Sequence, residues 1–360
     1  MPAHHAAARA AGKFARDRSS LELQPLGRGL INDTFLVSTG VFRFVLQRIN
    51  RHVFPDPAAV MSNLRTVTEH VRRVHNRSNH RGWRLPELIP TLAGEDFHRD
   101  DEGACWRAIT FIENSHGLPA VKEPGQAEQV GRALGRFHML VGGLPPDSLH
   151  DTLPGFHVTP LYLARFDEML RDAPPQPASP ELREALDFVE TRRPGADVLE
   201  NARHSGALRL RVIHGDPKLD NVLFDNHTGQ AVSLIDLDTV KPGLIHYDLG
   251  DCFRSCCNTA REGHVDGAFD PGIFRPILKG YLAEAADILT QHDRDYFHDA
   301  IRLLPFELGL RFLIDHLAGD VYFKVAQPGD NLIRALGQFR LARSVEAQEG
   351  EIRKIVADFN

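Results

Sequence analysis

The sequence predicts an α+β fold with two lobes, a small N-terminal lobe built on an antiparallel sheet and a larger, mostly helical C-terminal lobe. The chain has 360 residues, 42% of them hydrophobic, which is enough for two cores. Its first third holds short apolar runs separated by turn residues, whereas its last third shows the apolar spacing of helices. We expect the N-terminal lobe at residues 1–112, a hinge at 113–119 and the C-terminal lobe at 120–360.

The N-terminal lobe is expected to begin with a strand hairpin. Residues 21–26 and 33–38 are its predicted strands, and residues 41–48 continue as a third strand. Apolar residues at helical spacing predict a helix over 58–74. A last strand at 106–112 precedes a polar segment that contains Gly and Pro, and this change predicts the hinge.

The C-terminal lobe shows helical patterns at residues 125–141, 302–317 and 332–355. The proline-rich segment 171–180 cannot hold a helix through its middle and is expected to connect two helices.

Charge and composition favour a small-molecule substrate in the cytoplasm. A net charge of -6 gives no general reason for binding nucleic acid or an anionic membrane. No apolar stretch is long enough to span a membrane, and residues 1–18 lack the apolar core of a secretory signal. A short helix or frayed end is preferred there over a transit peptide. Cys105, Cys252, Cys256 and Cys257 lack zinc-site spacing, so we expect buried reduced thiols.

The most informative segment is residues 212–238. Asp216 follows His214-Gly215, Asn221 comes five residues later, and Asp236 ends another apolar run fifteen residues beyond. Phosphoryl transfer needs one carboxylate to accept the hydroxyl proton and two oxygen ligands for Mg²⁺ on the nucleotide phosphates. The kinase pattern H-x-D-x(4)-N with a later Asp supplies these three groups. The sequence therefore predicts an ATP-dependent kinase.

The segment also resembles a known family. His214-Gly215-Asp216 with Asn221 is similar to the aminoglycoside-phosphotransferase branch of the kinase-like superfamily, where Gly replaces the protein-kinase Arg. More narrowly, the chain resembles the N-acetylhexosamine 1-kinase group over residues 20–355. The segments that carry this resemblance are 29–34, 46–50 with Val53-Phe54, 218–221, 236–240 and 307–313. It implies a bilobal protein-kinase-like fold, Mg²⁺ with ATP, and phosphorylation of the anomeric hydroxyl of N-acetylglucosamine or N-acetylgalactosamine.

The resemblance implies roles for individual residues. Asp216 would be the catalytic base, and Asn221 and Asp236 would be Mg²⁺ ligands. Lys218 would neutralise charge during transfer, unless it is only a solvated loop lysine. The expected nucleotide-binding residues are Gly27, Gly29, Asn32, Thr34, Gln47, Arg48, Phe111 and Glu113. The expected sugar-binding residues are Asp216, Arg311 and Tyr322, with Asp251 and Arg254 as secondary candidates for which an internal salt bridge is the alternative.

Two positions stay open. Asp238 could serve the metal, a substrate hydroxyl or only the fold, whereas His214 is expected to support the catalytic loop. Where protein kinases carry V-A-I-K on the third strand, this chain has Phe-Val-Leu-Gln ending at Gln47, so the phosphate-binding lysine is replaced. Arg48 is the favoured substitute, but adjacent strand residues face opposite sides, so it would need a bulge or twist. Arg28, Lys218 or the metal could also supply the charge.

Two rival functions use the same motif. A kinase of another sugar, an aminoglycoside or an amino alcohol would keep the same catalytic groups, because the motif reports the reaction and not the acceptor. A cationic acceptor would need a carboxylate-lined site, for which Asp248, Asp251, Asp315 and Asp320 are available. A non-catalytic nucleotide-binding protein is disfavoured because all three oxygen groups of the transfer machinery are present.

Overall fold

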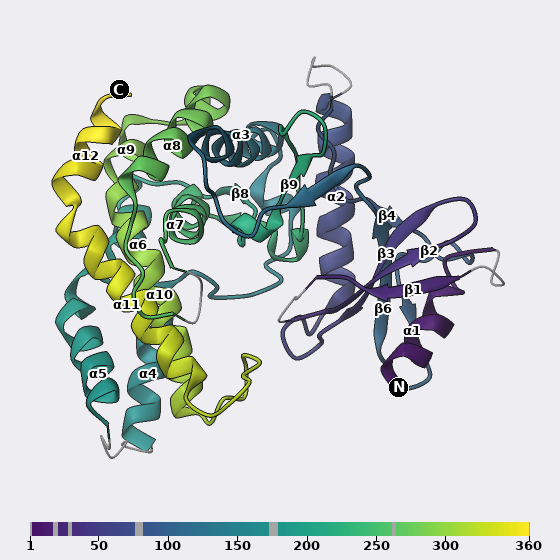
Figure 1. The fold of residues 1–360 in the computed structure, drawn as a ribbon, viewed down its shortest axis with the longest axis horizontal. Coiled ribbons are helices and arrows are strands. Elements are labelled where there is room, and N and C mark those ends of the chain that lie inside the picture. Colours follow the sequence, from purple (N-terminus) through teal and green to yellow (C-terminus); the bar gives the residue numbers. More distant parts are fainter. Residues whose placement is uncertain are drawn as a thin grey trace.

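The computed structural model describes residues 2–16, 21–27, 31–75, 82–172, 179–260 and 264–359 and shows two lobes of unequal size (Figure 1). The smaller lobe contains the N-terminus and the main sheet. The larger lobe is mostly helical and contains the C-terminus, and the long helix α2 stands between the two. This arrangement confirms the predicted bilobal α+β fold.

The smaller lobe is built on an antiparallel sheet. Its elements are α1 (Pro2–Ala11), β1 (Glu22–Pro25), β2 (Asp33–Ser38), β3 (Arg43–Ile49), α2 (Pro57–His75), β4 (Leu88–Ile89), β5 (His98–Arg99) and β6 (Cys105–Thr110). Within the described residues the neighbours run β1, β2, β3, β6, β4, and β5 pairs with the other end of β6. The predicted strands and the helix at 58–74 are therefore present, with small shifts of their ends.

The two faces of this sheet pack against different parts of the molecule, because successive side chains on a strand point to opposite faces. The outer face packs on the alanine-rich helix α1, and its buried residues are Phe35, Val37, Phe44, Leu46, Trp106 and Ala108. The inner face contributes Val45 and Ile109 to the core that also contains residues of α2 and the larger lobe. Residues 44, 46 and 48 thus belong to one face, and residues 45 and 47 to the other.

The larger lobe contains short strands beside many helices. Its strands are β7 (Ser115–Gly117), β8 (Arg211–Ile213), β9 (Val222–Asp225), β10 (Ala231–Leu234) and β11 (Lys241–Gly243). Its helices are α3 (Pro124–Val141), α4 (Thr159–Asp172), α5 (Pro180–Arg192), α6 (Val198–His204), α7 (Ile245–Cys256), α8 (Pro271–Ala285), α9 (Gln291–Asp295), α10 (Phe297–Leu317), α11 (Asp330–Ala347) and α12 (Glu349–Ala357). Most of the proline-rich connection, residues 173–178, lies outside the described part of the chain.

The segment predicted as a hinge is partly a strand. Within 113–119, β7 pairs antiparallel with β9, and the Asn226 backbone N–H donates to the Asn114 carbonyl at 2.9 Å. Hydrogen bonds therefore attach this segment to the larger lobe from Asn114 onward. A rotation between the lobes would have to turn before Ser115, which narrows the proposed hinge.

The helix predicted at 332–355 is two helices. Gln348 separates α11 from α12 with a non-helical backbone (φ -109°, ψ 14°). Its side-chain amide donates to the Phe269 carbonyl at 2.9 Å and to the Ser344 carbonyl at 3.2 Å. These bonds to a neighbouring segment stabilise the break, which apolar spacing alone cannot reveal. Among the described helices, none combines the length and apolar composition of a membrane span.

Candidate active site

A short hairpin brings the two predicted metal ligands together. Asn221 precedes β9 and Asp236 follows β10, and in the antiparallel register Leu234 lies opposite Val222. The Ile235 backbone N–H donates to the Asn221 carbonyl at 2.8 Å and extends this pairing by one step. The residues that begin and end the hairpin are therefore neighbours.

A second strand pair brings the catalytic loop beside the same segment. In the β8–β11 register Ile213 lies opposite Lys241, and the Thr239 hydroxyl donates to the His214 carbonyl at 2.9 Å. Gly215 has φ +87°, and a Cβ there would lie 2.6 Å from the Thr239 carbonyl oxygen. A side chain is excluded by both the backbone conformation and the space. This explains why glycine stands where protein kinases have arginine.

Asp216 is held as an ionised carboxylate. Lys218 Nζ donates to its Oδ2 at 2.5 Å, and Asn221 Nδ2 donates to its carbonyl at 2.6 Å and to Oδ2 at 3.3 Å. Burial acts to raise the pKa of Asp216, but the charge and hydrogen bond of Lys218 outweigh it and hold the pKa below its usual value. Oδ1 accepts no hydrogen bond from the described residues, so it is available to a ligand.

The loop before Asp216 is anchored by Asp248. One carboxylate oxygen accepts from the His214 backbone N–H at 2.7 Å, and the other accepts from the Gly215 N–H at 2.8 Å. His138 Nε2 lies 2.8 Å from the same carboxylate. Such bonds to backbone donors fix the loop geometry.

His214 also supports the loop. Its Nδ1 accepts from the Asp216 N–H at 3.2 Å, so Nε2 carries the proton and donates to the Ile235 carbonyl at 3.0 Å. Burial lowers the pKa of His214 and favours this neutral form. The contacts fit the structural role expected for His214.

A buried His157–Glu307 pair holds the catalytic loop from the other side. His157 Nε2 lies 2.7 Å from the Gly215 carbonyl, and Nδ1 lies 2.9 Å from Glu307 Oε1. Both partners are acceptors, so both ring nitrogens donate. Burial acts to lower the pKa of His157, but the Glu307 carboxylate outweighs it and raises the pKa. This pair gave no signal in the sequence, because its members are far apart along the chain.

Asp236 has the marks of a cation ligand. It adopts a left-handed backbone (φ 67°), an uncommon conformation for a residue other than glycine. Burial, together with the nearby carboxylate of Asp238, raises its pKa to about 7. A bound cation favours the ionised form of neighbouring carboxyl groups that otherwise repel each other.

The donor set fits Mg²⁺. Asn221 uses its Nδ2 on Asp216, so its amide oxygen, on the residue paired with the backbone of Ile235 next to Asp236, is free to bind a cation. Mg²⁺ usually takes one or two protein oxygens together with substrate phosphates. Within the described ranges, no group of three or more His, Cys, Asp or Glu residues could hold a metal ion. Asn221 and Asp236 with nucleotide phosphates would make up the coordination instead.

Polar residues of the small lobe reach Asp238. Asn32 Nδ2 donates to Asp238 Oδ2 at 2.8 Å, and Arg107 on β6 forms a buried ion pair with Oδ1. Arg107 also donates to Gln47 Oε1 through Nε at 2.9 Å and Nη2 at 2.6 Å. The Gln47 amide in turn donates to the Thr34 hydroxyl at 3.2 Å. The structure therefore connects Asn32, Thr34 and Gln47 to the site through Arg107 and Asp238.

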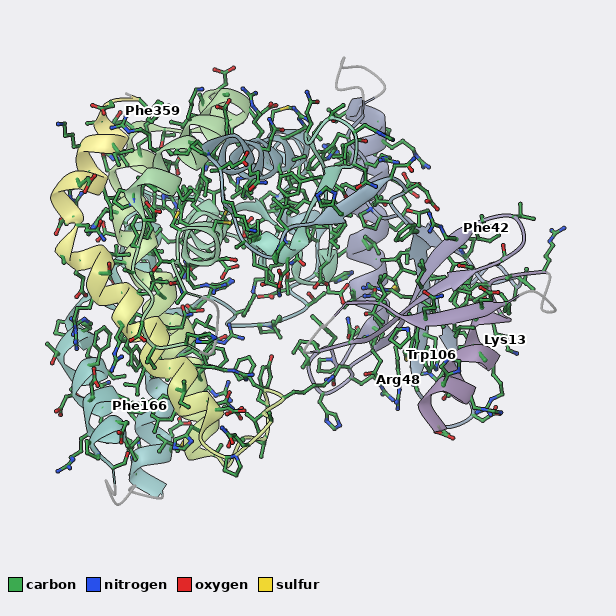
Figure 2. The ribbon with its side chains drawn as sticks, viewed as in Figure 1. Lys13, Phe42, Arg48, Trp106, Phe166 and Phe359 are labelled. Carbon is green, nitrogen blue, oxygen red and sulfur yellow. The ribbon has the colours of Figure 1, made fainter. Side chains whose placement is uncertain are left out.

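Arg48 lies on the other face of the sheet. The β3–β6 register runs without a bulge from Phe44 to Ile49, so no irregularity turns Arg48 inward. Arg48 lies opposite Trp106, and its side chain is 44% exposed and 3.8 Å from Asp33 (Figure 2). Strand alternation thus overturns the expectation that Arg48 replaces the lysine.

The remaining predicted nucleotide-binding residues are Phe111, Glu113, Gly27 and Gly29. Phe111 and Glu113 both contact Arg43, which lies 4.8 Å over the Phe111 ring and forms an ion pair with Glu113. Gly27 has φ +75°, as suits a turn glycine. Gly29 and Arg28 lie outside the described residues.

Arg311 is the main sugar-site candidate that the structure places near Asp216. Its guanidinium lies over the rings of Phe156 at 4.9 Å, Tyr162 at 5.5 Å and Phe323 at 5.7 Å. Burial acts to lower the pKa of Arg311, but Tyr162 and Glu307 first, and then Tyr322 and Asp216, outweigh it and raise the pKa. Tyr322 is half-exposed beside Phe323. No hydrogen bond within the described part of the chain occupies the Arg311 guanidinium.

Most of the acids considered for a cationic acceptor site already accept hydrogen bonds from the protein itself. Asp315 accepts from three backbone N–H groups and from Asn331, and Asp320 also accepts from Asn331. Asp248 is used by the catalytic loop. Asp251 pairs with Arg254 through two bonds of 2.9 and 2.6 Å. The Oδ2 of Asp251 is buried and has no hydrogen-bond partner among the described residues.

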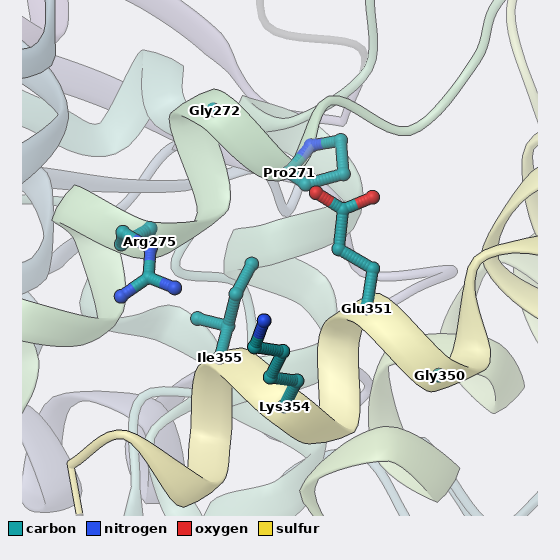
Figure 3. A pocket seen from close by; sticks show the side chains of 7 residues that line it. All are labelled: Pro271, Gly272, Arg275, Gly350, Glu351, Lys354 and Ile355. Carbon is teal, nitrogen blue, oxygen red and sulfur yellow. The ribbon is translucent and has the colours of Figure 1, made fainter.

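The distinct surface hollow in Figure 3 lies elsewhere. It has a volume of about 510 Å³ and is lined by residues of α8 and α12, including Arg275 and Lys354. None of its lining residues belongs to the loops described above.

Comparisons with known proteins agree with this geometry. The model of the APH family, described as a phosphotransferase enzyme family, matches residues 22–282. A homoserine kinase of Methylobacillus glycogenes is 22% identical over 307 residues, which cover 85% of this chain and 82% of that protein.

Two solved structures share the fold. The microcompartment-associated aminopropanol kinase superposes with a TM-score of 0.66 at 17% identity, covering 96% of this chain and 98% of that one. The GDP complex of wild-type aminoglycoside 2'-phosphotransferase-IIIa superposes with a TM-score of 0.59 at 13% identity, covering 96% and 99%.

Proposed function

The chain belongs to the phosphotransferase enzyme family, and within that family we propose that it transfers the γ-phosphate of ATP to the anomeric hydroxyl of an N-acetylhexosamine. The family match confirms the superfamily predicted from the His214-Gly215-Asp216 pattern and makes the chain a small-molecule kinase. The observation that carries the reaction is the convergence of Asp216, Asn221 and Asp236 on one point between two strand pairs.

Asp216 is proposed as the base. Its Oδ2 is occupied by Lys218 and Asn221, so Oδ1 is the oxygen that would accept the proton of the sugar hydroxyl. As that proton leaves, the sugar oxygen bonds to the γ-phosphorus, the bond from phosphorus to the β–γ bridging oxygen breaks, and ADP departs. The low pKa of Asp216 keeps the carboxylate ionised and ready at neutral pH.

Lys218 and the metal ligands are proposed to balance charge. Mg²⁺, when bound by Asn221 and Asp236, would neutralise the phosphates and orient them. Lys218 is held cationic, because the charges of Asp216 and Asp236 raise its pKa despite burial. Its contact with Asp216, with the charge of Asp236 nearby, suits a group that stabilises the charge of the transferring phosphoryl group.

The charges around the acceptor site support a neutral acceptor. Arg311 lies near Asp216, and its guanidinium makes no hydrogen bond within the described residues. Asp248, Asp315 and Asp320, in contrast, accept hydrogen bonds from the protein itself. An amine such as aminopropanol would meet the Arg311 cation there, and of the four acids considered for a cationic acceptor only Asp251 keeps a buried oxygen without a partner among the described residues. The hydroxyl and acetamido oxygens of an N-acetylhexosamine would accept from Arg311 instead. We propose Arg311 and Tyr322 as sugar contacts, with Asp251 and Arg254 as further ones.

A second acceptor is favoured by the same arginine. A carboxylate-bearing alcohol such as homoserine would pair well with Arg311, and the homoserine kinase relative makes this the rival to test.

An acceptor panel tests the proposal. With ATP and Mg²⁺ we would assay N-acetylglucosamine, N-acetylgalactosamine, glucose, homoserine, aminopropanol and kanamycin, and locate the phosphate on the product by NMR. We expect a sugar 1-phosphate from an N-acetylhexosamine, and binding without turnover for its 1-deoxy analogue. Phosphate at a 6-hydroxyl, or turnover of homoserine alone, would reject the N-acetylhexosamine assignment and leave the kinase assignment in place.

A further inference from the structure

We infer that Arg107 on β6 is the cation that the small lobe presents to the nucleotide phosphates, in place of the lysine that protein kinases carry on the third strand. This inference rests on the proposed kinase function and identifies a phosphate-binding residue of the same site.

The first step is the position of Arg107 in the sheet. Gln47 lies opposite Arg107 in the β3–β6 register, and Thr34 lies opposite Gln47 in the β2–β3 register. Directly opposed residues share a face, so these three side chains form a polar row across neighbouring strands. The row lies on the inner face, with Val45 and Ile109, which pack into the core shared with the larger lobe. The third-strand lysine position, Gln47, is therefore adjacent to Arg107.

The second step is how Gln47 and Asp238 hold the guanidinium. Gln47 Oε1 accepts hydrogen bonds from Nε and Nη2 of Arg107, and Asp238 forms an ion pair with Nη2. The Arg107 and Asp238 side chains are only 2% and 3% exposed. A neutral amide at position 47 thus orients a cation supplied by the next strand. A lysine there would instead place two positive charges side by side.

The third step is the unused donor. Arg107 Nη1 is buried and has no hydrogen-bond partner among the described residues. Leaving a charged donor buried and unpaired is costly, and such groups commonly point at ligand atoms. A phosphate oxygen of the nucleotide would satisfy Nη1 and explain why this buried donor has no partner in the described part of the chain.

The fourth step assigns Asp238. It receives Arg107 from β6 and Asn32 from the segment before β2, and it follows Asp236 by two residues. Asp238 is therefore a positioning residue, which fixes the small-lobe cation relative to the metal ligand. This resolves the three roles left open for Asp238 by its sequence position.

The test compares nucleotides that do and do not carry phosphate. Calorimetry would measure the Kd of Mg·ATP and of adenosine for wild type, Arg107→Gln and Arg107→Lys, with circular dichroism to confirm folding. We expect Arg107→Gln to weaken Mg·ATP binding roughly 10- to 100-fold, as for loss of a charge-assisted hydrogen bond, and to leave adenosine binding unchanged. Arg107→Lys should recover part of the loss. Arg72→Gln is the matched control, since Arg72 is an exposed arginine of α2 paired with Glu87.

A double variant keeps the test informative if Arg107→Gln folds poorly. Gln47→Lys with Arg107→Gln moves the cation to the third strand, and we expect its Kd for Mg·ATP to lie within about tenfold of the wild-type value. A folded double variant that binds Mg·ATP more than about 100-fold more weakly than the wild type would overturn the equivalence of the two positions.

The outcomes separate the inference from the function. Two results would overturn the inference alone, provided that the wild type binds Mg·ATP. One is an Arg107→Gln variant with the wild-type Kd for Mg·ATP. The other is an Arg107→Gln variant whose affinities for Mg·ATP and for adenosine fall by the same factor. A loss in Arg48→Gln with none in Arg107→Gln would do the same. A wild-type protein that binds no Mg·ATP and phosphorylates no acceptor would overturn the proposed function and the inference together.

Discussion

The catalytic loops of the larger lobe and the inner face of the small-lobe sheet contribute to one site in different ways. In the larger lobe, Asp216, Asn221 and Asp236 occur within one short stretch, and two local strand pairs suffice to bring them together. In the small lobe, Asn32, Gln47 and Arg107 come from separate segments and meet only because β2, β3 and β6 are neighbours. Local motifs can therefore be found by spacing, whereas cross-strand rows require the strand order.

The larger lobe should show the largest effect. Asp216→Asn keeps the shape of the side chain but removes the proton acceptor, so we expect kcat to fall by ~10² or more with little change in the Kd of Mg·ATP. Steady-state kinetics and calorimetry measure the two quantities. Asp220→Asn is the matched control, because Asp220 is an exposed acid in the same loop. Near wild-type turnover in Asp216→Asn would show that another group takes the proton.

The acceptor side should respond next. Arg311→Ala removes the guanidinium over the Phe156 and Tyr162 rings, and we expect the KM for the sugar to rise ~10-fold or more while the KM for ATP changes little. Arg165, an exposed arginine of α4, provides the control Arg165→Ala. An equal rise in both KM values would place Arg311 outside the acceptor site.

A third prediction uses pH to examine where the two regions meet. Because the pKa of Asp236 is raised to about 7, a proton competes with Mg²⁺ at this carboxylate when pH falls. We expect the apparent Kd of Mg²⁺ in the presence of ADP to weaken about tenfold from pH 8 to pH 6. The raised pKa also affects the free energy of unfolding of the ligand-free protein. The protonated Asp236 carboxyl contributes stability at low pH, and this contribution is lost as pH rises from the ordinary Asp value of 3.8 to about 7.

Titration calorimetry and thermal unfolding across this range measure both effects of Asp236. Asp236→Asn should abolish the pH dependence of Mg²⁺ binding along with most of the affinity. A Kd that does not change between pH 6 and pH 8 in the wild type would contradict the prediction.

The smallest expected change is a movement between the lobes. Since Ser115–Gly117 pairs with β9, we expect any closing rotation to occur through residues 111–114 and to leave β7 attached to the larger lobe. Crystal structures of the free protein and of a complex with ADP, Mg²⁺ and the sugar would measure the lobe angle. Identical angles would remove the hinge, while a rotation centred after Gly117 would contradict its place at residues 111–114.

The sequence by itself determined the reaction class and the architecture of the protein. Asp216, Asn221 and Asp236 could be proposed as the base and the metal ligands because they lie close together along the chain, around a single hairpin. The helix at 58–74 and the strands around it followed from local periodicity, which depends only on near neighbours.

Tertiary structure decided what depends on partners distant along the chain. Arg48 and Arg107 are both arginines on predicted strands, and only the register shows that one lies on the face covered by α1 and the other faces the larger lobe. Likewise, the occupation of Asp248 and Asp315 by backbone donors, and the charged His157–Glu307 pair, emerge only after folding. The physical reason is that the charge and availability of a buried group depend on which groups surround it.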